Sequence, residues 1–213
     1  NYWPEPTGIS IYTTDLAESL KSEGLDVSVL TSLPHYPWWK VPDEFTQFGE
    51  GISEINGVQV VRVKHFIPSR MDVITRVKFE FSLWKNLNRV SKSLLNENFD
   101  LIISCIPTVA AGIIGGRLAA KLNVPLGLIV QDLSGAGAKQ SGLRGGAIIS
   151  KLAHTVEESV LKRAAGIVVV SPAMRDSMIA LGISSKKITQ IPNYSARKVE
   201  QLEKKSSRSI FGW

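Results

Sequence analysis

Four short stretches of this 213-residue chain combine small residues with side chains that could act on a ligand. They are Thr7-Gly8, His35-Tyr36, Ile106-Pro107-Thr108 and Gln131-Asp132. The first precedes a helical pattern, and the other three follow short apolar segments that are typical of strands. Ligands of open α/β sheets bind at the carboxyl ends of the strands, so we expect these stretches to meet at one edge of a sheet.

Two chemical roles are consistent with the first and last stretches. Gly8 at the start of a helix allows backbone N–H groups to approach an anion, and the helix dipole favours that charge. The alternative is simple helix initiation, with Thr7 as the N-cap. Asp132 directly follows an apolar strand, where a carboxylate could orient or deprotonate a sugar hydroxyl. Its alternative is capping of the next turn, and we favour the functional interpretation for Asp132.

Several familiar enzyme classes lack their motifs here. The sequence has no G-x-G-x-x-G between a strand and a helix, no G-x-x-x-x-G-K-[ST] and no G-x-S-x-G. The three histidines, His35, His65 and His154, have no metal-ligand spacing, and the single Cys105 is too few for a zinc site or a disulfide framework. We therefore expect no metal and no nicotinamide, flavin or P-loop chemistry.

Composition and charge indicate a globular protein with an uneven surface. Hydrophobic residues make up 44% and charged residues 21% of the chain, which, without a long apolar run, predicts a soluble cytoplasmic protein. Residues 1–60 hold nine acidic side chains against two lysines, a balance of −7, whereas residues 61–92 hold eight basic against two acidic side chains, a balance of +6. The basic block suggests a membrane, phosphate-bearing or nucleic-acid partner, or simply a solvated helix face.

Apolar periodicity predicts an α/β protein. Strands are expected at 26–31, 100–104, 125–130, 166–170 and 188–191, and helices at 8–25, 73–96, 108–122, 148–163 and from Pro172 onward. Asn56-Gly57 between two strand-like runs predicts a hairpin. In the helix over 73–96, the apolar side is expected to hold Val73, Val77, Phe81, Trp84, Leu87 and Leu94. Strands this apolar are covered on both faces, which favours a Rossmann-like three-layer domain with a mostly parallel sheet.

The two ends of the sequence predict a domain cut from a longer chain. The chain starts in the turn YWPEPTGIS, where a doubly wound fold has its first strand, and it ends in the basic, Ser-rich KKSSRSIFGW. We therefore expect residues 1–195 to form an N-terminal domain that lacks its first strand. Residues 196–213 would begin a linker to a second, truncated domain.

Five motifs together resemble a known family. YWPEPTGIS, LPHYP, LIVQDL, VLKRAAGIVVVSPAM and ITQIPN are similar to the N-terminal half of a family 4 glycosyltransferase with the GT-B fold. Within that family they most resemble the colanic acid and O-antigen biosynthesis transferases. The resemblance implies an acceptor-binding domain that faces a donor-binding domain across a cleft. Leu133-Ser134-Gly135 departs from the Trp-Pro-Glu that many relatives carry there.

The resemblance also implies roles for particular residues. Thr7 and Gly8 would lie in the loop that approaches the donor diphosphate, and Asp132 would be the catalytic position facing the transferred sugar. His35, Tyr36 and Gln131 would line the acceptor side. The nucleotide-sugar would be a co-substrate, with no other cofactor, and transfer would retain the anomeric configuration. Because the family's paired glutamates belong to the other domain, these residues alone are expected to be inactive.

The basic helix predicts contact with a membrane. Lys78, Lys85 and Arg89, with Trp84 nearby, could lie on an anionic leaflet, which suits the polyprenyl-diphosphate-linked acceptors of the family and a peripheral place on the inner face of the cytoplasmic membrane. Two rivals remain open. One is a GT-B nucleotide-sugar epimerase; the other is a non-catalytic basic module that binds nucleic acid, a partner we do not expect.

Overall fold

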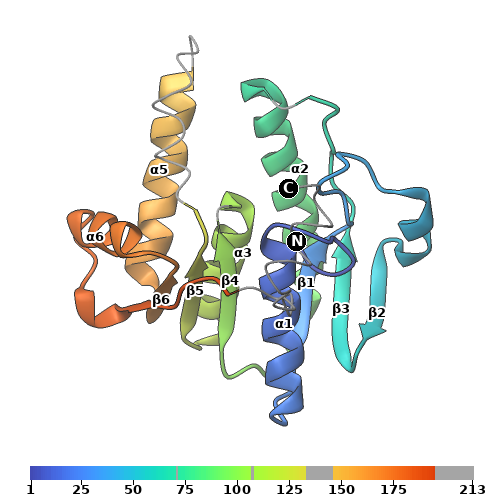
Figure 1. The fold of residues 1–213 in the computed structure, drawn as a ribbon, viewed down its shortest axis with the longest axis horizontal. Coiled ribbons are helices and arrows are strands. Elements are labelled where there is room, and N and C mark those ends of the chain that lie inside the picture. The colour runs from blue at the N-terminus through green and yellow to red at the C-terminus, as the bar shows by residue number, and fades with distance from the viewer. Residues whose placement is uncertain (71, 107, 133–145, 195–213) are drawn as a thin grey trace, which may run out of the picture.

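The computed structural model describes residues 1–70, 72–106, 108–132 and 146–194 (Figure 1). Its helices are α1 (Ile9–Ser22), α2 (Val73–Val90), α3 (Val109–Leu122), α5 (Gly146–Arg163) and α6 (Pro172–Ala180), with short 3-10 turns η1 (Asp43–Phe48), η2 (Ser93–Asn96) and η3 (Ser185–Lys187). Its strands are β1 (Ser28–Ser32), β2 (Gly51–Ile55), β3 (Val58–Val63), β4 (Ile102–Ile106), β5 (Leu126–Val130), β6 (Gly166–Val169) and β7 (Ile188–Gln190).

The strands form two sheets. The first has the order β1-β3-β2, with β1 parallel and β2 antiparallel to β3. The second has the order β4-β5-β6-β7 and is parallel throughout. This confirms the predicted α/β class with a mostly parallel arrangement. The predicted hairpin is also confirmed, because Asn56 (φ 50°) and Gly57 (φ 78°) supply the two left-handed residues of a tight turn between β2 and β3.

Two helix starts show why the sequence folds locally as it does. At α2 the Asp72 carboxylate accepts the Thr75 N–H at 2.8 Å, and the Thr75 hydroxyl accepts the Asp72 N–H at 2.8 Å, which is a capping box. At α6 the Ser171 hydroxyl accepts the Met174 N–H at 3.2 Å, with Pro172 in the first turn as predicted. The helix predicted over 73–96 stops at Val90, and the 3-10 turn η2 follows after Lys92.

Helices cover both faces of the first sheet. Ala17 of α1 packs with Val58 and Val60 on one face. On the other face lies α2, which packs side by side with α3, the helix that covers β4 of the second sheet (Figure 1). The core between these helices contains Phe79, Leu83, Leu87, Ile114 and Leu118. The predicted apolar side of α2 was wrong in part, because Val77 and Phe81 are 41% and 61% exposed. A helix of 3.6 residues per turn places 79, 83 and 87 together and turns 77 and 81 away from them.

Within the described residues, β1 and β4 pair with a neighbouring strand on one side only. β1 and β4 each lie at the end of their sheet, yet Leu30 of β1 and Ile102 of β4 pack on the same α2–α3 core. Ile103 of β4 is 40% exposed, and α1 leads straight into β1 as the crossover helix of a right-handed βαβ unit does. We expect the edges of β1 and β4 to accept one further parallel strand, the one that the sequence analysis predicted.

This expectation can be measured by extending the chain. A five-residue Val/Ile strand joined through a short linker to Asn1 should raise Tm by at least about 3 °C, which corresponds to roughly 1 kcal/mol at this chain length. It should also slow amide hydrogen exchange in β1 and β4. A Ser/Asn extension of equal length is the matched control; equal Tm values for the two extensions would contradict the expectation.

Candidate functional site

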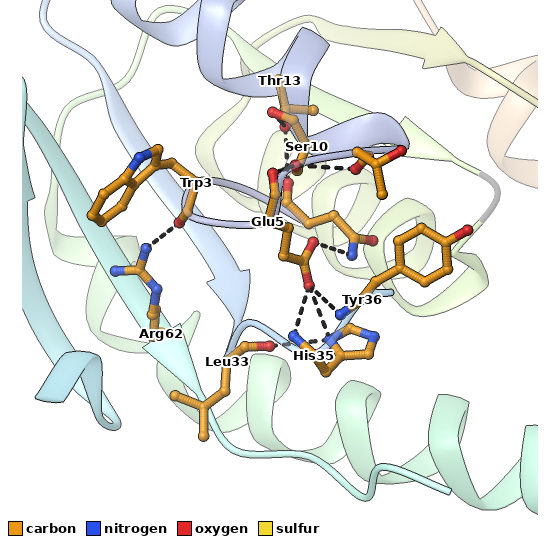
Figure 2. Close-up of polar contacts among 10 residues, drawn as sticks. Trp3, Glu5, Ser10, Thr13, Leu33, His35, Tyr36 and Arg62 are labelled. Carbon is orange, nitrogen blue, oxygen red and sulfur yellow. Dashed lines mark hydrogen bonds and ion pairs between the residues drawn. The ribbon is translucent and has the colours of Figure 1, made fainter. Parts of the chain in front are cut away.

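A buried carboxylate joins the first loop of the chain to the loop that follows β1. Glu5 is only 4% exposed, and its Oε1 accepts the backbone N–H of His35 at 2.8 Å and that of Tyr36 at 2.9 Å (Figure 2). Its other oxygen accepts the Asn1 side-chain amide at 2.5 Å. Hydrogen bonds to a carboxylate are stronger than those between neutral groups, so Glu5 fixes the position of the two loops.

Further contacts hold the opening loop on the body of the domain. The Arg62 guanidinium, 1% exposed on β3, donates to the Trp3 carbonyl at 2.6 Å and to the Ser53 hydroxyl at 3.1 Å. Hydroxyls of α1 complete the attachment, since Thr13 donates to the Asn1 carbonyl at 2.9 Å and the Ser10 hydroxyl donates to the Glu5 carbonyl (Figure 2). A loop without regular secondary structure is thereby tied to α1, β3 and the His35 loop at once.

His35 lies in the interior and not on an open surface. Its side chain is packed against the ring of His65 at a centroid distance of 4.5 Å and that of Phe79 at 5.6 Å. Nδ1 is 3.1 Å from the Leu33 carbonyl and 3.3 Å from the Glu5 carboxylate. Burial lowers the pKa of His35 below its usual value, although Glu5 opposes that shift. Acceptor binding by His35 stays a prediction; what the structure shows is an imidazole that packs beneath the loop.

His65, which the sequence does not mark as a functional residue, packs against His35. Both of its ring nitrogens are buried and have no hydrogen-bond partner within the described residues, and the ring contacts that of Phe79 at 5.1 Å. Burial, with a smaller contribution from His35, lowers the pKa of His65 to about 3. His65 is therefore neutral at pH 7 and acts as an aromatic spacer between α2 and the His35 loop.

Gly8 and Tyr36, assigned by the resemblance to the donor and acceptor sides, lie next to each other. A Cβ placed on Gly8 would lie 3.3 Å from the Tyr36 ring, and Gly8 has φ 69°, a conformation that favours glycine. Tyr36 is 37% exposed. The N-cap of α1 is Gly8, so the alternative in which Thr7 caps the helix is wrong. Thr7 is exposed beside it, and its carbonyl accepts the Ser10 hydroxyl at 3.3 Å.

Gln131 and Asp132 lie at the carboxyl end of β5, as predicted. Gln131 Oε1 accepts the side-chain amide of Asn193 at 2.8 Å, and Asp132 is exposed. Tyr194 follows Asn193 in the chain. Its hydroxyl donates to Asp15 of α1 at 2.5 Å, and its ring packs edge-on against that of Tyr12 at a centroid distance of 5.5 Å. The segment after β7 thus connects the end of β5 to α1, a link that the sequence analysis missed because it used 188–193 only as a family motif.

Two of the sequence segments considered above lie partly or wholly outside the described residues. Pro107 and the loop over 133–145, including Leu133-Ser134-Gly135, lie outside the described residues. Within residues 1–70, 72–106, 108–132 and 146–194, no three His, Cys, Asp or Glu residues are grouped as metal ligands would be. In the same ranges no helix has the length and hydrophobicity to cross a membrane.

The predicted membrane-contact residues lie on α2 in different surroundings. Lys78 and Lys85 are exposed, whereas Trp84 is half-buried and packs on the α2–α3 core. Arg89 forms an ion pair with Glu50.

Comparison with known proteins assigns the chain to a family. The sequence model of the family described as Glycosyl transferase 4-like domain matches residues 7–194. The chain belongs to that family. It is 28% identical over 199 residues to the putative colanic acid biosynthesis glycosyl transferase WcaI of Escherichia coli (strain K12), which covers 92% of this chain and 48% of that protein. The chain thus spans about half the length of this curated relative.

Solved structures share the fold at low identity. Sucrose-phosphate synthase from Thermosynechococcus elongatus superposes with a TM-score of 0.63 at 18% identity, over 97% of this chain and 47% of the synthase. Anabaena Alr3699/HepE superposes with a TM-score of 0.56 at 13% identity, over 100% of this chain and 48% of HepE. These likenesses confirm the predicted fold class, the N-terminal half of a GT-B protein.

Truncation of Glu5 tests the connection between the loops. Glu5→Ala leaves the buried N–H of His35 and the part-buried N–H of Tyr36 without acceptors, and a buried donor left in this way costs about 1–3 kcal/mol. We expect urea unfolding to show a loss of about 2–4 kcal/mol, with a smaller loss for Glu5→Gln, which keeps an acceptor oxygen. The exposed Glu23→Ala is the matched control. Equal stability of Glu5→Ala and Glu23→Ala would contradict the role given to Glu5.

The shifted histidine predicts a pH dependence. Because the pKa of His65 falls from 6.5 in the unfolded chain to about 3 in the folded one, the unfolded state binds more protons between these values. Stability therefore decreases as pH falls from about 6.5 towards 3, by up to roughly 1.4 kcal/mol per pH unit from this group. His65→Phe, which preserves the aromatic packing, should lose that component, measured as the wild-type minus variant difference in unfolding free energy at pH 7 and pH 5. A difference that does not change with pH would contradict it.

Proposed function

We propose that the chain is the acceptor-side half of a retaining glycosyltransferase that transfers a sugar from a nucleotide-sugar to a lipid-linked saccharide. The product would belong to a surface polysaccharide assembled at the cytoplasmic face of the membrane. Membership of the Glycosyl transferase 4-like family over residues 7–194 carries this proposal. The similarity to WcaI, named for colanic acid biosynthesis, supports the polysaccharide class.

The residues near the carboxyl ends of the strands support the proposed donor and acceptor sides. Gly8 presents the start of α1 without a side chain, which suits the approach of an anionic diphosphate to backbone N–H groups. Tyr36 and the Gln131–Asn193 pair offer hydroxyl and amide groups to saccharide hydroxyls. The structure of HepE is described as a complex with UDP and glucose, which supports a nucleotide-sugar as the second substrate.

In this proposal the described residues act by positioning and not as a nucleophile–base pair. Glu5 fixes the His35 and Tyr36 amides, and with them the exposed Tyr36 ring that lies next to Gly8. Asp132, exposed at the end of β5, would orient the hydroxyls of the transferred sugar. Positioned charges and hydrogen-bond donors of this kind stabilise a developing transition state without covalent catalysis.

Sugar transfer is to be tested with the full-length protein, labelled UDP- and GDP-sugars, and a polyprenyl-diphosphate-linked saccharide. Label that moves into the lipid fraction supports the proposal. Interconversion of the nucleotide-sugar without acceptor would favour an epimerase instead. Tight oligonucleotide binding with a steep salt dependence, without transfer, would favour a nucleic-acid module.

Within that assay, Asp132→Ala tests the proposed catalytic position. We expect turnover to fall by at least about tenfold, because a group that orients the reacting sugar acts mainly in the transition state. Circular dichroism and Tm should stay unchanged, since the side chain is exposed. Asp176→Ala, also exposed but on α6, is the matched control. Unchanged turnover in Asp132→Ala would exclude this role.

A further inference from the structure

The outward face of α2 carries apolar side chains that the fold does not cover. Ile74 is 68%, Val77 41% and Phe81 61% exposed. Their spacing of three and four residues places them in one stripe along the helix. The inward face of the same turns is also apolar, with Phe79 and Leu83 buried in the core. A helix that is apolar on two opposite sides is suited to contact a second apolar medium.

Basic side chains flank this stripe. Arg70, Lys78 and Lys85 are all exposed, and neither lysine makes an ion pair within the described part of the chain. The acidic side chains nearby are engaged elsewhere. Asp72 caps the helix, and Glu80 accepts from Arg76 at 3.2 Å and from the Ala110 N–H of α3 at 3.1 Å. The four basic side chains Arg70, Arg76, Lys78 and Lys85 outnumber these two carboxylates, so the net charge of the surface is positive.

The helix that carries the stripe also contacts the loop of the candidate site through its inward face. The buried Phe79, from the same turns of α2, contacts His35 and His65 beneath the His35-Tyr36 loop. Phe66, 41% exposed, is fixed beside the helix by its N–H, which donates to the Ser82 hydroxyl at 2.7 Å. α2 begins where the chain leaves the carboxyl end of β3, on the side of the molecule where the opening loop lies (Figure 1).

We propose that the α2 docking surface, defined by Phe66, Arg70, Ile74, Val77, Lys78, Phe81 and Lys85, binds the headgroup–acyl boundary of an anionic lipid bilayer. Apolar side chains between lysines and arginines are the pattern of helices that lie in a membrane interface. Negative lipid headgroups complement the outward positive charge.

The surface differs from the one that the sequence alone indicated. Lys78 and Lys85 belong to it, but Arg89 is held by Glu50 and Trp84 packs on the core. Ile74, Val77 and Phe81 complete the surface, because the structure turns them outward. The proposal deepens the proposed function but is tested apart from it, since vesicles without saccharide or nucleotide-sugar measure the docking alone.

The experiment is co-sedimentation of the 213-residue chain with vesicles of phosphatidylcholine, with and without phosphatidylglycerol. We expect binding only to the vesicles that contain phosphatidylglycerol. Lys78→Glu should weaken it by at least about fivefold, from about 1 kcal/mol per basic side chain near the surface. Ile74→Ser with Phe81→Ser should weaken it by more than about tenfold, because two apolar side chains leave the acyl boundary.

Two matched controls separate the surface from general charge and hydrophobicity. Lys121→Glu at the end of α3 and Ile179→Ser on α6 replace exposed residues elsewhere, and both should bind as the wild type does. All variants are checked for unchanged Tm. Equal binding to both vesicle types, equal losses in the controls, or no loss in the α2 variants would overturn the proposal. Self-association of the chain without vesicles would also overturn the proposal if Phe81→Ser abolished it. That result would assign the stripe to contact with a second copy of the chain.

Discussion

The candidate site depends on the carboxylate of Glu5, buried where two irregular loops meet. Neither loop belongs to a sheet ladder, so the N–H groups of His35 and Tyr36 need an acceptor from elsewhere. One oxygen of Glu5 accepts both. These two hydrogen bonds fix the chain around Tyr36. They therefore also fix how closely Tyr36 approaches Gly8 at the start of α1. The positions of the residues assigned to donor and acceptor sides are thus coupled through a side chain that contacts neither ligand in the proposal.

Helix α2 packs against the same region on its interior side and connects it to the rest of the domain. Its inward face packs Phe79 against His35 and His65, and Leu83 and Leu87 against α3. The neutral, buried His65 fills this space without a hydrogen-bond partner in the described structure. The outward face of α2 follows from the same helical geometry. Burial of one apolar side leaves the other, with its lysines, at the surface.

Local signals explain which elements the sequence predicted correctly. The Asn56-Gly57 hairpin and the start of α6 at Pro172 depend on backbone conformations that these residues favour in any context. The exposed and buried sides of α2 were predicted less well, because apolar residues occupy both and periodicity cannot say which side meets the core. Glu5 gave no signal as a site residue, since a glutamate between two prolines is ordinary in sequence and acquires its role only when a loop 30 residues away folds against it.

The sequence by itself determined the α/β class, the order of the elements and the stretches that end strands, because these depend on neighbouring residues and on apolar spacing. It also determined, through its motifs, the family that the comparison confirmed. Only the tertiary structure decided that His35 is interior, that Gly8 lies next to Tyr36, and that the Tyr194 hydroxyl donates to Asp15. These contacts join segments between 28 and 179 residues apart, and their geometry depends on how the sheets and helices pack, which no local pattern encodes.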